Sequence, residues 1–199
     1  MRLDGGNPVL DLVNTVYGQV DGPVEHDVLA APADLVTFAR RVGVAGTRTP
    51  AGTAALADAR ALRAAVDAIL SARLGDRAAP RRAVAALAAA GQAAYAAARL
   101  APAGATVTWT WPDVDARSPV HRLAHAALAL LSDPAELARL HRCAGCCWMY
   151  LDHSRGAGRR WCSMADCGTE AKKRRYVQRR RERTGRAAPT GLDVRYLTT

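Results

Sequence analysis

The chain has 199 residues, a formal net charge of +10 and a hydrophobic content of 50%, much of it alanine. No run of 18 or more apolar residues occurs, and the first six residues lack the apolar stretch of a secretory signal. The sequence therefore predicts a cytoplasmic protein that does not span a membrane. Because only four Trp, five Tyr and one Phe are present, we expect a core built mainly from aliphatic packing between helices.

Positive charge is concentrated towards the end of the chain. Residues 1–152 carry 15 Lys and Arg against 14 Asp and Glu, whereas residues 153–186 carry 12 against 3. Such asymmetry indicates a polyanionic partner, most often nucleic acid and less often an anionic membrane surface. We expect a near-neutral domain over 1–141, a basic module over 142–186, and a tail over 187–199.

The first predicted helix begins near Val9, because apolar residues follow at helical spacing through Val16. Asp11 and Asn14 then lie on a different face. They are interpreted either as part of a ligand pocket or as buried anchors that tie the helix to neighbouring loops, and the anchor interpretation is favoured. Residues 18–31 are predicted to form a loop, since they contain two glycines and a proline.

Helical periodicity continues through the next hundred residues. It predicts helices over 32–41, 53–74, 80–100 and 118–131, followed by a short helix opened by Asp133 and Pro134. Residues 105–111 alternate β-branched and aromatic side chains and predict a strand. Its partner must come from residues 101–104 and their surroundings or from the N-terminal loops. The predicted fold class is mainly α, with a helical N-terminal domain that contains a small strand element.

Three histidines are candidate metal ligands. His121 and His125 are four residues apart on a predicted helix, but the glutamate of an H-E-x-x-H site is absent. These two and His141 are interpreted as surface or packing residues. Asp11 with Asn14 is too small a set to support a reaction, so the sequence predicts no enzyme.

All five cysteines lie within 25 residues. They include a C-x-x-C pair (Cys143, Cys146) and a C-x-x-x-x-C pair (Cys162, Cys167), and Cys147 has no pair of its own. Short-spaced thiolate pairs suit tetrahedral Zn²⁺, and four sulfurs leave no position for water, so we predict one structural zinc ion. A disulfide framework, an iron–sulfur cluster, an oxidation-sensitive thiol cluster and unligated thiols are the alternatives.

The cysteine-rich segment resembles the CGNR zinc-finger family. That family places a cysteine pair before W-x-F-x-D, then R-R-W-C-S-M, then C-G-N-R and a basic helix; this chain has the runs 148–152, 159–164 and 167–170 at those places. The resemblance implies that Cys143, Cys146, Cys162 and Cys167 hold zinc in a treble-clef-like finger. Thr169 and Glu170 stand where the family has Asn and Arg, so the charge of the last position is reversed.

A second, shorter resemblance lies near the N-terminus. The run L-D-L-V-N-T at residues 10–15 is similar to the start of the ABATE domain, which accompanies the CGNR finger. Together the two resemblances imply a zinc-containing, DNA-binding transcription regulator and cover nearly the whole chain. An RNA-binding zinc finger and a thiol or zinc redox sensor are the alternatives. A homodimer and an unknown small-molecule effector are compatible with each of them.

Within the finger, residues 148–151 are expected to form a strand, 156–158 a turn and 159–161 the return strand. Trp148, Tyr150 and Trp161 are interpreted as cover for the metal site rather than as stacking partners for bases. Residues 170–183 predict a helix that is basic nearly all round, and the alternative is a merely solvated face. The candidate nucleic-acid contacts are Arg159, Arg160, Lys172, Lys173, Arg174, Arg175, Gln178, Arg179 and Arg181.

Overall fold

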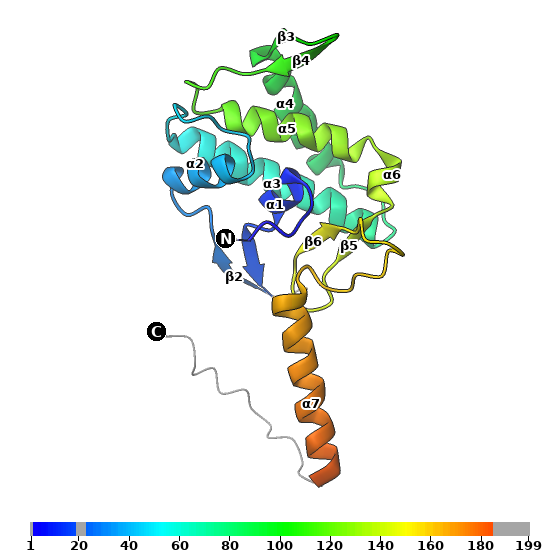
Figure 1. Cartoon of the computed structure of the whole chain (residues 1–199). Coiled ribbons are helices and arrows are strands. Elements are labelled where there is room, and N and C mark those ends of the chain that lie inside the picture. The colour runs from blue at the N-terminus through cyan, green and yellow to red at the C-terminus, as the bar shows by residue number, and fades with distance from the viewer. Residues whose placement is uncertain (1, 19–22, 185–199) are drawn as a thin grey trace.

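The computed structural model describes residues 2–18 and 23–184 and shows a helical body from which one long helix projects (Figure 1). The helices of the body are α1 (Pro8–Val13), α2 (Pro32–Arg41), α3 (Thr53–Leu74), α4 (Arg81–Ala97), α5 (Ser118–Leu131) and α6 (Pro134–Leu137). The projecting helix is α7 (Thr169–Thr184), preceded by a single π-helical turn, η1 (Met164–Gly168). No helix in these described ranges is long and apolar enough to cross a membrane.

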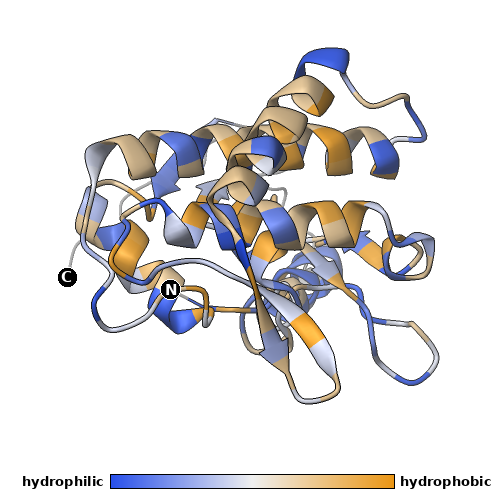
Figure 2. Ribbon diagram, turned by 90° about the horizontal axis from the view of Figure 1, so that it is seen from above, coloured by the Kyte–Doolittle hydropathy of each residue, from blue (hydrophilic) through white to orange (hydrophobic). Residues whose placement is uncertain are grey.

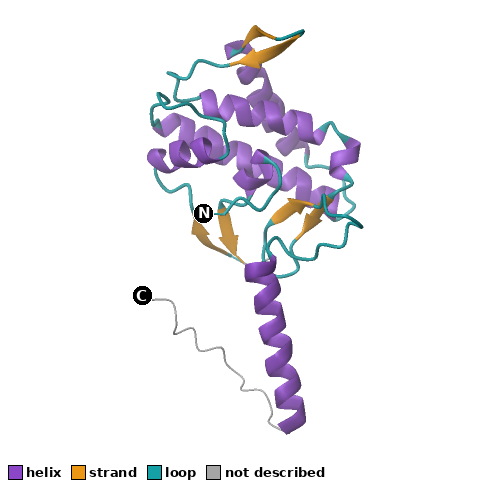
Figure 3. Cartoon of the chain, viewed as in Figure 1, coloured by secondary structure: helices purple, strands orange, loops and turns teal. Residues whose placement is uncertain are grey.

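Three antiparallel hairpins complete the described parts of the chain. They are β1 (Val16–Gly18) with β2 (Val24–Asp27), β3 (Arg99–Ala103) with β4 (Thr106–Thr110), and β5 (Leu140–Arg142) with β6 (Met149–Leu151). The β3–β4 hairpin lies at the end of the body opposite α7, whereas β1–β2 and β5–β6 lie near the base of α7 (Figure 3). The mainly α fold class is confirmed.

The core forms where α3 packs on α4 and α5, with α1 against α3 and α5. Leu10, Val66, Leu70 and Leu123 are fully buried there. Hydrophobic residues run along the helices of the body and are interrupted by hydrophilic ones (Figure 2). The α4–α5 contact is so close that a Cβ atom at Gly91 would lie 2.6 Å from Leu128 Cδ1. Small residues therefore permit tight helix packing in a chain with few aromatic side chains.

The predicted helices are found, and α2, α3 and α5 have the predicted bounds. The first helix is shorter than predicted, because α1 ends at Val13 and Val16 begins β1 instead of continuing the helical face. The loop predicted for residues 18–31 is wrong in part, because Val24–Asp27 pairs with Val16–Gly18. Residues 19–22, which connect these two strands in the sequence, lie outside the described ranges. The predicted tail, residues 187–199, also lies outside them.

The predicted strand near 105–111 is confirmed as β4. Its partner is β3, with Leu100 opposite Trp109, and the turn contains Gly104 at φ +62°. The helix predicted over 80–100 therefore ends at Ala97. The partner strand was hard to recognise because its sequence, R-L-A-P-A, is poor in β-branched residues.

The return strand predicted at residues 159–161 is wrong. Within the described residues, β6 pairs with β5, which precedes Cys143 rather than following the turn. Residues 159–161 run back as irregular chain, and the carbonyl oxygen of Arg160 accepts a hydrogen bond from Ala144 N at 3.0 Å. The short helix α6 therefore leads into β5, and only then into the cysteine cluster.

Candidate metal centre and basic helix

The four predicted ligand sulfurs form one cluster. The Sγ atoms of Cys143, Cys146, Cys162 and Cys167 all lie within 4.8 Å of one another. Cys146 Sγ is 3.7 Å from Cys162 Sγ, which is 3.8 Å from Cys167 Sγ. Four sulfurs arranged tetrahedrally about 2.3 Å from a zinc ion would be separated by about 3.8 Å. The cluster therefore fits one zinc ion with every coordination position taken by sulfur, which is a structural site.

The first knuckle is the tight turn between β5 and β6 that carries Cys143 and Cys146, and backbone hydrogen bonds close it. Cys143 N donates to the carbonyl oxygen of Trp148 at 2.8 Å, and Gly145 N donates to Cys143 Sγ at 3.3 Å. A Cβ atom at Gly145 would lie 3.0 Å from the Cβ atom of Cys167, so a side chain at this position would crowd the opposite knuckle. Glycine thus permits the two knuckles to approach each other.

The second knuckle is built at the start of the projecting helix. Cys162 precedes η1, and Cys167 lies within that turn. Ser163 caps the turn, because its Oγ accepts a hydrogen bond from Asp166 N at 3.3 Å. The backbone of Gly168 also donates to Ser163 O at 3.0 Å. One pair of sulfurs thus comes from a hairpin and the other from a helix start, which is the treble-clef-like arrangement that was expected.

The crowded thiols strongly affect one another's protonation. The pKa of Cys143 is lowered because Cys146 and Cys162 donate hydrogen bonds to its sulfur. The pKa of Cys146 is raised to about 12, and that of Cys162 is also raised, chiefly because each shares its proton with Cys143. Zinc ligands must be thiolates, so metal binding has to displace protons that this cluster holds.

Aromatic side chains surround the sulfur cluster. Trp148 and Tyr150 are buried, as the covering interpretation requires, and Trp161 is half-buried. Trp148 Nε1 donates to Val16 O at 3.0 Å, and its ring lies 4.7 Å from that of Tyr17. Burial raises the pKa of Tyr150 to about 12. These rings exclude water from the cluster and join it to β1.

Asp152 organises the turn that follows β6. Its Oδ1 accepts hydrogen bonds from the backbone and hydroxyl of Ser154, and its Oδ2 accepts one from Arg159 N at 2.9 Å. These bonds, above all the one from the Ser154 hydroxyl, lower the pKa of Asp152 to about 2. Asp152 thus satisfies two backbone amides of this turn.

Arg159 is turned inward. Its guanidinium donates to the carbonyl oxygens of Asp4, Trp161 and Cys162, and it lies 4.3 Å from the centre of the Tyr150 ring. These contacts occupy the side chain within the protein itself. Arg160, by contrast, is exposed beside Trp161.

Asp11 and Asn14 are both buried. Asp11 Oδ1 accepts a hydrogen bond from Gly5 N at 2.9 Å, and the Asn14 amide bonds to the backbone of Met149. Burial raises the pKa of Asp11 to about 6. The geometry supports the anchor interpretation, although Asn14 also lines a cavity.

The three histidines lie outside the sulfur cluster. His125 Nδ1 is 3.0 Å from the Tyr95 hydroxyl, and the ring of His141 stacks on Tyr150. His121 is buried in α5, and desolvation lowers its pKa. All three therefore pack against the body or the finger, as predicted.

The helix α7 presents the predicted basic surface. It carries eight Lys or Arg and two Glu, and every side chain from residue 172 to residue 183 is exposed. Figures 1 and 3 show that it extends away from the body along its whole length. Lys173 Nζ lies 4.0 Å from a carboxylate oxygen of Glu170, and Gln178 donates to Glu182 at 2.8 Å. The predicted contacts on this helix are thus accessible.

Fold and site together define a helical protein that carries a C-terminal four-cysteine zinc finger. Residues 139–180 match the model of the CGNR zinc finger, and residues 6–134 match that of the ABATE family, described as "Putative stress-induced transcription regulator". The chain belongs to the ABATE family. No curated protein matches it. The family description names a regulator of transcription and not an enzyme.

Proposed function

We propose that this protein regulates transcription by binding duplex DNA through α7. The observation that supports the proposal is the exposed cationic helix, which begins at the cysteine cluster and extends beyond the body. An α-helix with its side chains is about 10–12 Å across, and the major groove of B-DNA is about 12 Å wide. A helix presented in this way can enter the groove without interference from the body.

The charge on α7 favours an anionic partner. Like charges three or four residues apart destabilise an isolated helix, and Arg175 has Arg179 at this spacing. DNA phosphates would relieve this repulsion. Because each contact between a phosphate and a Lys or Arg releases a counterion from the DNA, the affinity should fall as the salt concentration rises. We assign Lys172, Lys173, Arg179, Arg181 and Arg160 to phosphates.

Base recognition would come from a different set of side chains. Arg174, Arg175 and Gln178 lie in the middle of α7, and Arg and Gln can each form paired hydrogen bonds to the base edges of the major groove. Gln178 would exchange its bond to Glu182 for one to a base. These three residues are therefore our candidates for sequence specificity.

The proposal is tested with the full-length, zinc-loaded protein and a fluorescently labelled random duplex. Anisotropy titrations at several salt concentrations should show an affinity that falls steeply, by about a thousandfold between 50 and 200 mM salt for six phosphate contacts. The double variant Lys172→Ala/Lys173→Ala, which removes two proposed phosphate contacts, should bind more weakly. Arg81→Ala/Arg82→Ala, an adjacent exposed pair on α4, is the matched control and should bind like the wild type.

Two results would contradict the proposal. One is binding that is absent or insensitive to salt in a protein with full zinc content. The other is equal loss of affinity in the two double variants. The RNA-binding alternative is tested by competition, with unlabelled structured RNA or unlabelled duplex DNA added to the complex with the labelled duplex. Displacement by RNA at a lower concentration than by duplex DNA would favour that alternative.

A further inference from the structure

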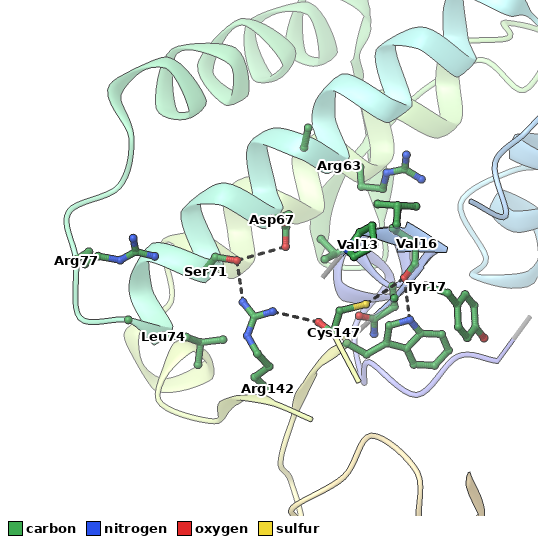
Figure 4. A pocket seen from close by; sticks show the side chains of 17 residues that line it. Val13, Val16, Tyr17, Arg63, Asp67, Ser71, Leu74, Arg77, Arg142 and Cys147 are labelled. Atoms are coloured by element: carbon green, nitrogen blue, oxygen red, sulfur yellow. Dashed lines mark hydrogen bonds between the residues drawn. The ribbon is translucent and has the colours of Figure 1, made fainter. Parts of the chain in front are cut away.

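A cavity of about 640 Å³ lies where the helical body meets the finger (Figure 4). Its walls come from three segments that are distant in sequence. The helix α3 contributes Arg63, Asp67 and Ser71, the β1–β2 hairpin contributes Val16 and Val24, and the finger contributes Arg142, Cys147 and Trp148. Asn14, the end of α1 and residues that follow α3, up to Arg77, also line the cavity. The cavity is therefore a joint property of the body and the first cysteine knuckle.

The arginines that line the cavity differ in whether they form a hydrogen-bonded ion pair with a carboxylate. Arg63 forms two hydrogen bonds of 2.7 Å with Asp27, which neutralises it. Arg142 donates only to neutral groups, Ser71 Oγ at 2.9 Å and the carbonyl oxygen of Cys147 at 3.2 Å. The guanidinium of Arg77, at the outer end of the cavity, forms no hydrogen bond or ion pair with residues 2–18 or 23–184, although the backbone N–H of Arg77 donates to Ala72 O at 2.9 Å. Two arginines are thus available to an anion.

One carboxylate opposes them. Asp67 lines the cavity, and its pKa is raised because the surrounding walls remove water from it. With Asp67 ionised, the lining residues that the structure describes keep an excess of one positive charge from Arg77 and Arg142. A single negative charge on a ligand would balance it.

Part of the remaining lining is apolar. Val13, Val16, Val24, Leu74 and the Trp148 ring supply surface that an apolar group can cover. A site with apolar walls and a few convergent charged groups is typical of one that binds a small organic ligand. The lining thus favours a ligand with an anionic end and an apolar body over a bare inorganic ion.

Arg142 connects the cavity to the metal centre. It directly precedes Cys143, and its guanidinium holds the carbonyl oxygen of Cys147, the residue after Cys146. Figure 4 shows this guanidinium between Ser71 of α3 and Cys147 of the knuckle. A ligand bonded to Arg142 would therefore hold in place the residues that flank both ends of the first knuckle, Arg142 itself and Cys147.

We propose that this cavity binds a small organic carboxylate with an apolar body and that the occupant stabilises the cysteine cluster through Arg142. A regulatory role for this ligand rests on the proposed function. Ligand binding and zinc retention can, however, both be measured without DNA. Failure of this proposal can therefore be told apart from failure of DNA binding.

Binding is tested by calorimetric titration of the full-length, zinc-loaded protein with benzoate, phenylacetate and hexanoate. We expect saturable binding of at least one of them, and binding of benzyl alcohol that is weaker by roughly tenfold or more, because a charged hydrogen bond is lost. Ala64→Glu puts a negative charge on an exposed position of α3 that lines the cavity and should weaken carboxylate binding to a similar extent. Ala57→Glu, exposed on the same helix but outside the cavity, should leave it unchanged.

The link to the metal is tested by the rate at which zinc is lost to a coloured chelator. The carboxylate that binds most tightly should slow this loss several-fold at saturation, and the effect should disappear in Arg142→Gln and in Ala64→Glu, but not in Ala57→Glu. The proposal would be overturned by absence of saturable binding up to about 10 mM, or by equal binding of the neutral alcohol. Zinc loss that is unchanged when the carboxylate is bound would overturn the coupling.

Discussion

The side-chain amide of Asn14 bonds both backbone groups of Met149, 135 residues away in sequence. Nδ2 donates to Met149 O at 2.8 Å, and Met149 N donates to Oδ1 at 2.9 Å. On the same edge of β6, Leu151 N donates to Gly5 O at 2.9 Å. The N-terminal segment thus supplies hydrogen-bond partners for the backbone groups on the edge of β6 that does not face β5. These bonds fix the finger on the body.

Replacing Asn14 should destabilise the protein strongly. Asn14→Ala would leave the N–H and C=O groups of Met149 buried without partners, at about 1–3 kcal/mol each. Urea unfolding followed by circular dichroism should therefore show a loss of about 2–6 kcal/mol. Asn7→Ala is the matched control, because Asn7 caps α1 through one hydrogen bond, and its loss should cost about 1 kcal/mol. Equal losses in the two variants would refute the anchoring role.

Asp11 should give the protein a measurable pH dependence. Its pKa is raised to about 6 by burial, so the folded state holds this proton more tightly than the unfolded state does. Ionisation of this carboxylate therefore lowers the free energy of unfolding. The loss is negligible below about pH 4 and grows to at most about 3 kcal/mol as the pH rises through 6. Asp11→Asn should thus gain stability relative to the wild type between about pH 4.5 and pH 7 in urea titrations. A difference that stays constant with pH would contradict this explanation.

The five cysteines should differ sharply in their effect on zinc content. Cys146→Ser removes a sulfur of the cluster and should lower the zinc retained after dialysis, because structural zinc sites bind strongly only with their full ligand set. Cys147→Ser is the adjacent control. The Cys147 thiol contacts Val16 O at 3.6 Å instead of the cluster, so this variant should retain one zinc per chain. Elemental analysis that finds the same zinc content in both variants would show that the ligands are assigned wrongly.

Two arginines of α7 should affect DNA binding in different ways. Arg179→Gln removes a proposed phosphate contact and should weaken binding to every sequence while lowering the salt slope by about one. Arg174→Gln removes a proposed base contact and should cost about 1–3 kcal/mol on a selected site, with little effect on random duplexes. Anisotropy with both duplex types separates these effects. Identical behaviour of the two variants would mean that α7 recognises phosphates alone.

Sequence patterns were sufficient for the long helices and for the sulfur cluster. Apolar spacing gave the bounds of α2, α3 and α5, because each buries one continuous face against the core. The spacing of Cys143, Cys146, Cys162 and Cys167 identified a cluster whose members are brought together by two short knuckles. Local signals of this kind need no knowledge of the rest of the fold.

Features that depend on distant contacts could not be found in this way. The strand β5 is three residues long, and its pairing with β6 is supported by Asn14 and Gly5 on the far edge. The inward orientation of Arg159 involves the carbonyl oxygen of Asp4, 155 residues away, whereas its sequence context suggested a nucleic-acid contact. The cavity beside Arg142 has walls from three segments and no local signature.

The most direct test of the account compares DNA binding by the wild type, Cys146→Ser and Cys147→Ser in one anisotropy titration at low salt. If the cysteine cluster fixes the start of α7 for entry into the major groove, Cys147→Ser should bind like the wild type, whereas Cys146→Ser should lose at least about tenfold in affinity, roughly 1.4 kcal/mol. Undiminished binding by Cys146→Ser, in a sample shown to lack zinc, would mean that the cationic segment binds without the metal centre and would contradict the account.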